Sequence, residues 1–364
     1  MPKHNNLKIC IVATSLSNGG TERFASTLSF MLDSLGYDVF LLSTKDSIDY
    51  HYAGQLYNLE KEAGSVNNVQ KLVCLYKFFK SEKFDIIIDN RARRDFVKEF
   101  LIYRFAYNKS RIISMIHNYN IYNYFPGSKS RANLIYKSNN EFVGVSRSIK
   151  DRMISEYGFE NIKSIYNPIN IADLQNKAKE FDVELPYQYI LYYGRFEEES
   201  KNLTLMIKSY AKSQLNKHSV KLLLMGKGDD FDYLKKLVES LQLQDMVVFL
   251  DYNPNPFPYV KQALFTTLSS KYEGFPMSII ESLAVGTPVV SVDCESGPSE
   301  VIKDRENGLL VKNYDEEALS LAFDMFLKDE PLYLNCKKNA PKSVAHLDVN
   351  VIINAWKSIL ENEA

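Results

Sequence analysis

Residues 264–294 read LFTTLSSKYEGFPMSIIESLAVGTPVVSVDC. Two short apolar runs in it, LFTTLSS (264–270) and PVVSVDC (288–294), have the length and composition of buried strands. The segment between them predicts a helix that begins at Pro276, because a proline at the first helical position loses no hydrogen bond. This helix has an apolar face at helical spacing, formed by Met277, Ile280 and Ala284. Strand, helix and strand in this order predict a parallel βαβ unit.

The same alternation extends through the chain. In the first half, apolar runs predict strands at 7–15, 38–44, 84–90, 111–118, 141–146 and 162–168. A polar stretch, 169–186, follows, and strands are then predicted at 189–194, 220–226, 246–251, 264–270, 288–294 and 307–311. The pattern predicts an α/β fold with two doubly wound, Rossmann-like domains, 1–168 and 169–346. We expect the two domains to face an interdomain cleft that binds the ligands.

Composition narrows the class of protein. A length of 364 residues favours two domains, and 45% hydrophobic with 24% charged residues is typical of a globular protein. The sequence contains no run of eighteen apolar residues and no signal peptide at its start. The four cysteines have neither CxxC nor metal-ligand spacing, which favours a reduced, cytoplasmic protein.

Charge is distributed unevenly. Residues 1–168 carry 23 basic and 16 acidic side chains, a net charge of +7. Because the whole chain has a net charge of −1, residues 169–364 carry −8. The stretch 91–111 (RARRDFVKEFLIYRFAYNKSR) interleaves basic and aromatic residues, and KLVCLYKFFKSEK (71–83) resembles it in composition. We expect a docking surface for anionic lipid or a lipid-linked acceptor, with Arg91, Arg93 and Arg94 at its centre. The alternative is that these helices cover the sheet and only their lysines are solvated.

Two glutamates bracket the start of the predicted helix in the opening stretch. Glu273 lies in the loop before the helix and Glu281 within it. Side chains lean toward a helix N-terminus, where backbone N–H groups lack partners, so both carboxylates can face one pocket. Such a site suits hydroxyl-rich, anionic ligands. The alternative is a surface loop glutamate and a solvated helix glutamate.

Glycines and cations recur after other predicted strands. SNGGTER (17–23) opens a helix, where Gly19 and Gly20 permit close backbone approach and Thr21 can cap the helix. Arg195 and Lys201 follow the first strand of the second domain, and both suit a diphosphate. Gly226-Lys227-Gly228 follows the next strand. The sequence lacks the GxGxxG fingerprint, which argues against a dinucleotide cofactor.

This ordered set of motifs resembles the family-4 glycosyltransferases, retaining enzymes of the GT-B fold that use nucleotide sugars and build bacterial surface glycans. The resemblance covers GGTER, GR…KN, GKG, EGFP-x4-E, GTPVV, SGPSE and NGLLV, and it is densest over 189–312. It implies that a C-terminal helix, about 347–364, packs back on the first domain. The amphipathic stretch 350–360 is suited to that position.

The resemblance also implies roles for individual residues. Glu281 would accept hydrogen bonds from the ribose hydroxyls, and Glu273 would hold the donor sugar with the backbone amides of Gly274, Phe275 and Pro276, next to Met277 and Ser278. Arg195 and Lys201 would bind the diphosphate and stabilise the leaving charge. Gly19 and Gly20, with Gly226 and Lys227, would contact the donor. His117 would lie near the reacting sugar.

The mechanism implied by the resemblance needs neither a protein nucleophile nor a metal. The acceptor attacks from the face that the nucleotide leaves, and a phosphate oxygen takes its proton. Asp230 and Asp232 fit the Asp-x-Asp pattern of metal-dependent transferases, but acidic residues are common at a helix start, so we interpret them as structural.

The expected partners follow from this interpretation. They are a nucleotide-sugar donor, a UDP sugar by resemblance, and a glycan or lipid-linked glycan acceptor, with peripheral contact to an anionic membrane and no nucleic acid. The alternatives are a sugar-nucleotide epimerase of the same fold and a non-catalytic module that binds a nucleotide sugar. The sequence leaves the sugar, the linkage, the acceptor and the oligomeric state open.

Overall fold

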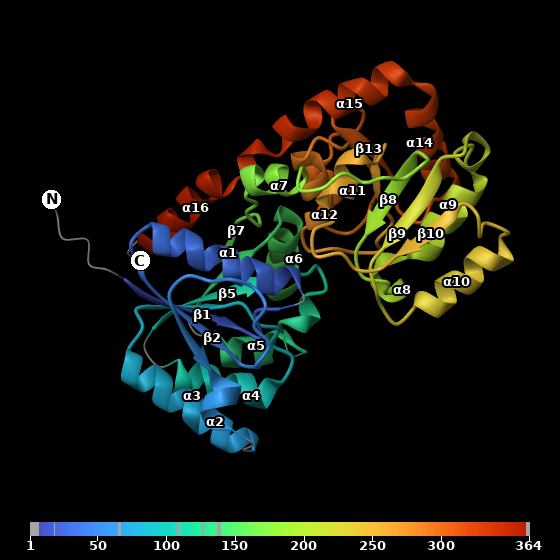
Figure 1. The fold of residues 1–364 in the computed structure, drawn as a ribbon. Coiled ribbons are helices and arrows are strands. Elements are labelled where there is room, and N and C mark those ends of the chain that lie inside the picture. The colour runs from blue at the N-terminus through green and yellow to red at the C-terminus, as the bar shows by residue number, and fades with distance from the viewer. Residues whose placement is uncertain are drawn as a thin grey trace. The chain divides into compact units, whose positions relative to one another are not determined.

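The computed structural model describes residues 7–17, 19–64, 67–107, 110–125, 127–136 and 140–361. The chain divides into two compact units, residues 1–168 with 349–364, and residues 169–348. Each unit is a parallel sheet flanked by helices, which confirms the predicted fold class (Figure 1). No described helix is both long and apolar enough to cross a membrane.

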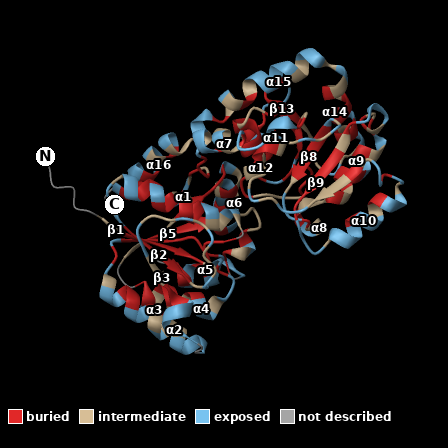
Figure 2. Ribbon diagram, in the orientation of Figure 1, coloured by how far each residue is buried: buried red, intermediate tan, exposed pale blue. Residues whose placement is uncertain are grey.

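The sheet of the first unit has the strand order β3-β2-β1-β4-β5-β6-β7. Its strands are β1 Lys8–Ala13, β2 Asp38–Ser43, β3 Gln55–Asn58, β4 Ile86–Asp89, β5 Arg111–Ile116, β6 Asn140–Gly144 and β7 Ile162–Ser164. All pairings are parallel, from Lys8 opposite Asp38 to Gly144 opposite Ser164. The inner strands are buried on both faces, which explains why they are continuous apolar runs in the sequence (Figure 2).

Helices cover this first sheet and end at recognisable signals. They are α1 Gly20–Ser34, α2 Leu59–Ala63, α3 Asn68–Glu82, α4 Phe96–Leu101, α5 Lys129–Ile135 and α6 Arg147–Tyr157, with a π-helix η1 at Ile102–Ala106 and a 3₁₀ turn η2 at Ile121–Asn123. Asn67 and Gln70 form a capping box at the start of α3. Gly158 ends α6 in the left-handed conformation that favours glycine.

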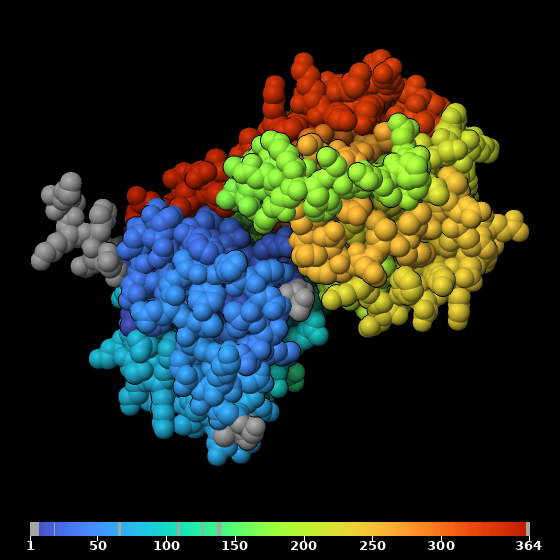
Figure 3. Space-filling view, viewed as in Figure 1, coloured from blue at the N-terminus to red at the C-terminus, as the bar shows by residue number. Residues whose placement is uncertain are grey.

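The last helix, α16 Val349–Glu361, also belongs to the first unit. Its apolar face is buried and includes the fully buried Trp356, whose ring centroid is 6.1 Å from that of Phe24 in α1. The red residues of α16 lie on the blue residues of α1 in Figure 3. The Arg111 guanidinium donates to the carbonyls of Ile359 (2.6 Å) and Leu360 (3.2 Å), which would otherwise be unpaired at the helix end.

The second unit repeats the same design with the strand order β10-β9-β8-β11-β12-β13. Its strands are β8 Tyr189–Tyr193, β9 Lys221–Met225, β10 Val247–Leu250, β11 Thr266–Leu268, β12 Val289–Asp293 and β13 Gly308–Lys312. The helices are α7 Ile171–Lys177, α8 Glu198–Lys201, α9 Leu203–Lys212, α10 Phe231–Ser240, α11 Phe257–Gln262, α12 Met277–Ala284, α13 Pro298–Val301, α14 Glu316–Lys328 and α15 Glu330–Ser343. In both sheets the order reverses at one point, where such folds bind ligands beyond the carboxyl ends of the strands.

Candidate active site

At the carboxyl edge of the second sheet, hydrogen bonds connect the loops that follow neighbouring strands. The Phe196 N–H, after β8, donates to the Lys227 carbonyl after β9 at 2.9 Å. The Glu273 N–H, after β11, donates to the Glu295 carbonyl after β12 at 3.0 Å. The reversal of strand order lies between β8 and β11, so these loops surround the place where the fold predicts a ligand.

Lys201 and Glu273 meet in this place. The Lys201 Nζ lies 2.6 Å from Glu273 Oε1, and the two side chains are only 18% and 13% exposed. The Ser270 hydroxyl donates to the same carboxylate oxygen at 2.7 Å. The site therefore holds an ordered ammonium beside a carboxylate whose Oε1 atom is already bonded. Ser270 was not predicted, because its position at the end of a strand gave no signal of its own.

Arg195 lies in a different environment from Lys201. Its side chain is 73% exposed, and its Nη2 atom is 3.9 Å from Glu197 Oε2, a weak ion pair in solvent. Its backbone is fixed, because the Tyr192 hydroxyl donates to the Arg195 carbonyl at 2.8 Å. Burial, and next the charge of Glu273, raise the pKa of Tyr192 well above its usual value, so this donor stays protonated. The structure gives Arg195 a fixed backbone and a guanidinium directed to solvent.

Glu281 lies within α12 and is 6% exposed. The Tyr193 hydroxyl donates to the Ser278 carbonyl at 2.8 Å and lies 3.4 Å from Glu281 Oε2. The carboxylate is therefore held beside the first turn of the helix, at the place that the sequence predicted. Tyr193, which lines this position from β8, was not predicted as a site residue.

The start of α12 corrects two details of the sequence analysis. Pro276 has φ −75° and ψ 93°, so it is the N-cap and the helix begins at Met277. Proline has no N–H, so Pro276 cannot supply an amide to a ligand, whereas Gly274 and Phe275 can. The helix lacks a side-chain cap, and among the described residues the N–H groups of Met277 and Ser278 have no partner.

The loop after β12 supports the Glu-Gly-Phe-Pro turn. The Ser296 hydroxyl donates to the Gly274 carbonyl at 2.8 Å. Gly297 has φ +106°, and a Cβ atom there would lie 2.3 Å from Pro276 Cδ. Any larger residue would push the turn away, so the SGPSE motif acts by packing against the EGFP motif.

The Gly-Lys-Gly motif is explained by backbone packing. A Cβ atom at Gly226 would lie 1.9 Å from the Gly194 carbonyl oxygen, and one at Gly228 would lie 2.1 Å from the Phe196 carbonyl oxygen. Both glycines therefore let the β8 and β9 loops touch. Lys227 is exposed, with its Nζ 5.1 Å from the Tyr252 ring centroid.

In the first unit, the Gly-Gly loop leads into α1. Gly19 is the N-cap and Gly20 the first helical residue, so Thr21 lies inside the helix and is not its cap, contrary to prediction. A Cβ atom at Gly19 would lie 2.2 Å from Glu22 Oε2, so a carboxylate lies beside this loop. Asn18, within the same motif, falls outside the described residues.

His117 follows β5 and packs against α1. Its ring meets Phe24 edge-on, with centroids 4.8 Å apart, and its Nε2 atom lies 2.5 Å from Asn90 Oδ1. Burial, and then the nearby charge of Arg93, lower the pKa of His117 to about 3. The imidazole is therefore neutral at physiological pH and offers hydrogen bonds rather than charge.

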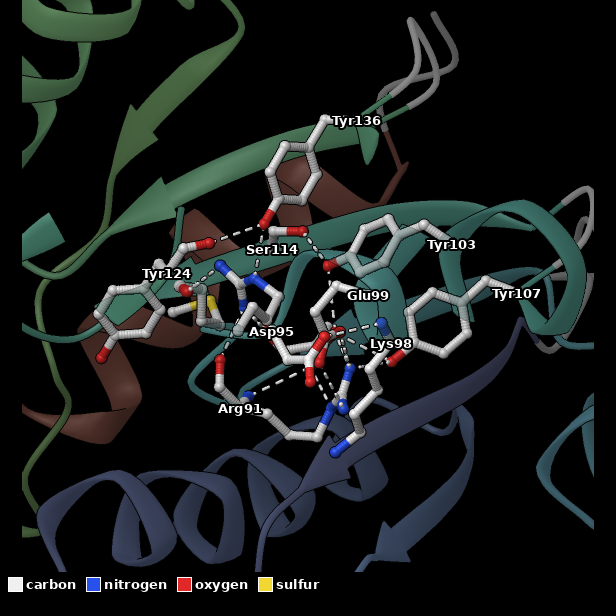
Figure 4. A network of polar contacts seen from close by, with 12 residues as sticks. Arg91, Asp95, Lys98, Glu99, Tyr103, Tyr107, Ser114, Tyr124 and Tyr136 are labelled. Carbon is white, nitrogen blue, oxygen red and sulfur yellow. Dashed lines mark hydrogen bonds and ion pairs between the residues drawn. The ribbon is translucent and has the colours of Figure 1, made fainter. Parts of the chain in front are cut away.

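Two of the three arginines predicted at a docking surface are buried, which is a correction. Arg91 is 4% exposed and its Nη2 atom pairs with Asp89 Oδ2 at 2.8 Å and Glu99 Oε2 at 2.9 Å (Figure 4). Burial alone would raise the pKa of Asp89, but the charges of Arg91 and Arg93 outweigh it and keep that pKa below its usual value. For Glu99 burial dominates, and its pKa is raised.

Arg93 is fully buried and donates to the Asp89, Arg91 and Met115 carbonyls at 2.8–3.1 Å. Among the aromatic residues of these two stretches, Phe78, Phe79 and Tyr103 are also in the core, whereas Tyr76 and Phe105 are exposed. Arg94 is exposed, and Lys109 lies outside the described residues. The alternative interpretation, helices covering a sheet, therefore describes most of this region. The sequence shows that these residues are basic, but it does not show that they are buried beside the carboxylate of Asp89.

No group of three or more metal-ligating side chains is gathered among the described residues. Asp230 Oδ2 accepts a hydrogen bond from the Glu198 N–H at 2.7 Å, and Asp230 is the N-cap residue of α10. Its contact is thus with the protein backbone.

Comparison with known proteins finds glycosyltransferases similar to both halves of the chain. Residues 18–173 match the family described as Glycosyltransferase Family 4, and residues 175–343 match Glycosyl transferases group 1. A Campylobacter jejuni protein, N-acetylgalactosamine-N,N'-diacetylbacillosaminyl-diphospho-undecaprenol 4-alpha-N-acetylgalactosaminyltransferase, is 29% identical over 97% of this chain and 99% of its own length. The amylovoran biosynthesis glycosyltransferase AmsD of Erwinia amylovora is 24% identical over 97% of this chain and 99% of its own.

Solved structures share the whole fold. Anabaena HepE, solved with UDP and glucose, has a TM-score of 0.79 at 18% identity and covers 98% of this chain and 100% of its own. A glycosyltransferase from Rickettsia africae has a TM-score of 0.76 at 20% identity over 99% of this chain and 100% of its own.

Proposed function

Because the chain is a glycosyltransferase of the GT-B fold, we propose that it moves a hexose or an N-acetylhexosamine from a nucleotide sugar to a glycan acceptor, with retention of anomeric configuration. The observation that supports this best is the Lys201–Glu273 ion pair at the carboxyl edge of the second sheet. It puts a cation for the diphosphate next to a carboxylate for the sugar hydroxyls. Glu281 lies in α12, whose Met277 and Ser278 N–H groups lack a partner among the described residues, and its carboxylate would accept hydrogen bonds from the ribose hydroxyls.

In the proposed step, the acceptor oxygen bonds to the anomeric carbon on the face from which the diphosphate leaves. The bond between that carbon and the diphosphate oxygen breaks, and a diphosphate oxygen takes the acceptor's proton. An ammonium has three N–H donors, so Lys201 can keep its bond to Glu273 and still donate to the leaving oxygen. Arg195 adds a second positive charge, so the step needs no metal ion and no protein nucleophile.

UDP is the nucleotide we propose, since HepE and the pneumococcal transferase GtfA were solved with UDP. The acceptor we propose is a lipid-linked glycan used for surface polysaccharide, because the Campylobacter relative is named for a diphospho-undecaprenol substrate. Such an acceptor would place the protein at the inner face of the cell membrane as a peripheral protein. Arg94 is the exposed arginine of the predicted docking surface that could contact it.

The test is turnover with a panel of UDP and GDP sugars, with and without a diphospho-undecaprenol-linked sugar, measured as nucleotide release and product mass. We expect one UDP sugar to be consumed faster with acceptor and the product to keep the donor's anomeric configuration. Lys201→Ala should lower kcat/KM by about two to three decades, whereas Lys212→Ala, which removes an exposed cation of the same unit, should not. Tight UDP-sugar binding without any turnover would instead indicate a binding module.

A further inference from the structure

One buried amide connects the functional parts of the first unit. Asn90, the residue after β4, is 1% exposed. Its Nδ2 atom donates to the Thr21 carbonyl in the first turn of α1 at 2.8 Å, and its Oδ1 atom lies 2.5 Å from His117 Nε2. Its own N–H donates to the Val12 carbonyl of β1 at 2.9 Å. Asn90 thus links β1, α1 and β5 at the point where the strand order of this sheet reverses.

These contacts fix the direction of the Asn90 amide. Thr21 offers a carbonyl oxygen, which can only accept, so the NH₂ group of Asn90 must face it. The amide oxygen must then face His117, and an oxygen accepts only from an N–H. His117 therefore carries its proton on Nε2, which leaves Nδ1 as a bare acceptor with no partner among the described residues.

The surroundings keep this ring neutral. The positive charge of Arg93 acts on it from the loop after β4, and the Phe24 ring covers it from α1. Tyr124, next to the His117 backbone, has its pKa raised to about 12 by burial and is uncharged as well. Among the described residues, the charge that acts on the pKa of His117 is the positive charge of Arg93, which lowers it further.

We propose that Asn90 is a positioning residue that locks His117 as the Nε2–H tautomer, so that Nδ1 accepts a hydrogen bond from a substrate hydroxyl. The same amide holds the first turn of α1, and with it the Gly19–Gly20 loop, in register with His117. This inference rests on the proposed transfer reaction, because the substrate hydroxyl is that of the transferred sugar or its acceptor. The residue itself is buried and touches no substrate.

The first experiment needs no turnover. Long-range ¹H–¹⁵N spectra of protein labelled at its five histidines, compared with His117→Gln, identify the His117 signals. We expect the Nε2–H tautomer without titration between pH 5 and 8. An Nδ1–H tautomer, or a ring that titrates near pH 6.5, would overturn the assignment whether or not the protein is a transferase.

The second experiment uses Asn90→Asp and Asn90→Ala. The isosteric carboxylate should raise the pKa of His117 into the measured range, and both variants should lower kcat by about a hundredfold through misplacement of the acceptor nitrogen. UDP affinity should fall much less than kcat, since the proposed ribose partner Glu281 lies in the other unit and the first unit contributes only the Gly19–Gly20 loop. Asn161→Ala, which removes a comparable amide-to-carbonyl bond to Asn140, is the matched control. If Asn90→Asp folds, as judged by Trp356 fluorescence, and retains wild-type kcat, the positioning role is refuted.

Discussion

Asp89 places a carboxylate at the buried end of β4, and Arg91 with Glu99 completes a charge cluster with almost no exposed surface. Removing one partner of such a cluster leaves the others uncompensated. We therefore expect Arg91→Ala to lower the free energy of unfolding by about 3–5 kcal/mol. Arg94→Ala, on the exposed neighbour, should change it by less than about 0.5 kcal/mol. Urea unfolding followed by Trp356 fluorescence measures both, and equal effects would contradict the buried network.

Substitution of Glu273 and of Glu281 in the second unit should have different effects, because we propose that the two carboxylates bind different parts of the donor. Glu281→Ala should weaken the binding of free UDP, because its proposed partner is the ribose. Glu273→Ala should leave UDP affinity nearly unchanged and reduce kcat, because the proposed partner of Glu273 is the sugar, which free UDP lacks. Calorimetry with UDP on both variants decides this point. Equal losses of affinity would mean that the two carboxylates act as one nucleotide-binding unit.

His117 should make the first unit sensitive to acid. Its pKa is about 3 when folded, against about 6.5 in an unfolded chain. Below pH 6.5 the unfolded chain binds a proton that the folded one does not, so stability is complete above that pH and falls on acidification. Through His117, the free energy of unfolding should change by at most about 1.4 kcal/mol per pH unit.

His117→Gln removes this dependence. At pH 7.5 we expect the variant to have a lower free energy of unfolding than the wild type. This difference should be smaller at pH 5 by up to about 2 kcal/mol, because only the wild type loses stability through His117. His51→Gln, which removes an exposed imidazole of the same unit, is the control. A deficit that stays constant between the two pH values would show that His117 takes up its proton over the same pH range in the folded protein as in the unfolded chain.

Among the elements, α16 depends on one side chain. Trp356 is fully buried, and its Nε1 atom has no hydrogen-bond partner among the described residues. Trp356→Ala should therefore cost about 3–5 kcal/mol through loss of apolar contacts and the cavity left behind. Trp356→Phe should cost well under half of that, since no hydrogen bond is lost. Unfolding followed by circular dichroism tests this, and equal costs would reveal a bond to the indole nitrogen.

The elements show which features a sequence can reveal. Strands buried on both faces are apolar runs, so β1, β4 and β12 were predicted within a few residues. β3 was missed, because QLYN is a short, polar strand at the sheet edge. Pro276 was placed one position too far into the helix, since proline is compatible with both the N-cap and the first turn.

The candidate site shows the complementary limit. Motifs and resemblance named Lys201, Glu273 and Glu281, which lie where the second sheet reverses its order. Resemblance could not show that Lys201 and Glu273 touch, or that Ser270 and Ser296 brace the turn, because those contacts arise from tertiary packing. The prediction that Arg91 and Arg93 form a docking surface was wrong for the same reason, because their burial beside Asp89 cannot be read from the composition of the sequence.

At the scale of the whole molecule, we expect transfer to continue in excess EDTA. Lys201, Arg195 and the unpaired N–H groups at the start of α12 would neutralise the diphosphate in place of a divalent cation. The measurement is turnover before and after chelation, followed by addition of Mg²⁺ or Mn²⁺. Activity that disappears with EDTA and returns with either ion would refute metal independence and return attention to Asp230 and Asp232.

Because α16 completes the first unit from the far end of the chain, the order of synthesis matters. The strands of the first sheet leave the ribosome before the second unit, residues 169–348, and α16 follows only after it. At about 5–20 residues per second, this interval lasts roughly 10–35 s. During that time Phe24 and the apolar surface around it are not yet covered by Trp356. We therefore expect a nascent first unit to expose apolar surface to chaperones until α16 emerges, whereas the second unit is contiguous in sequence and is synthesised without interruption.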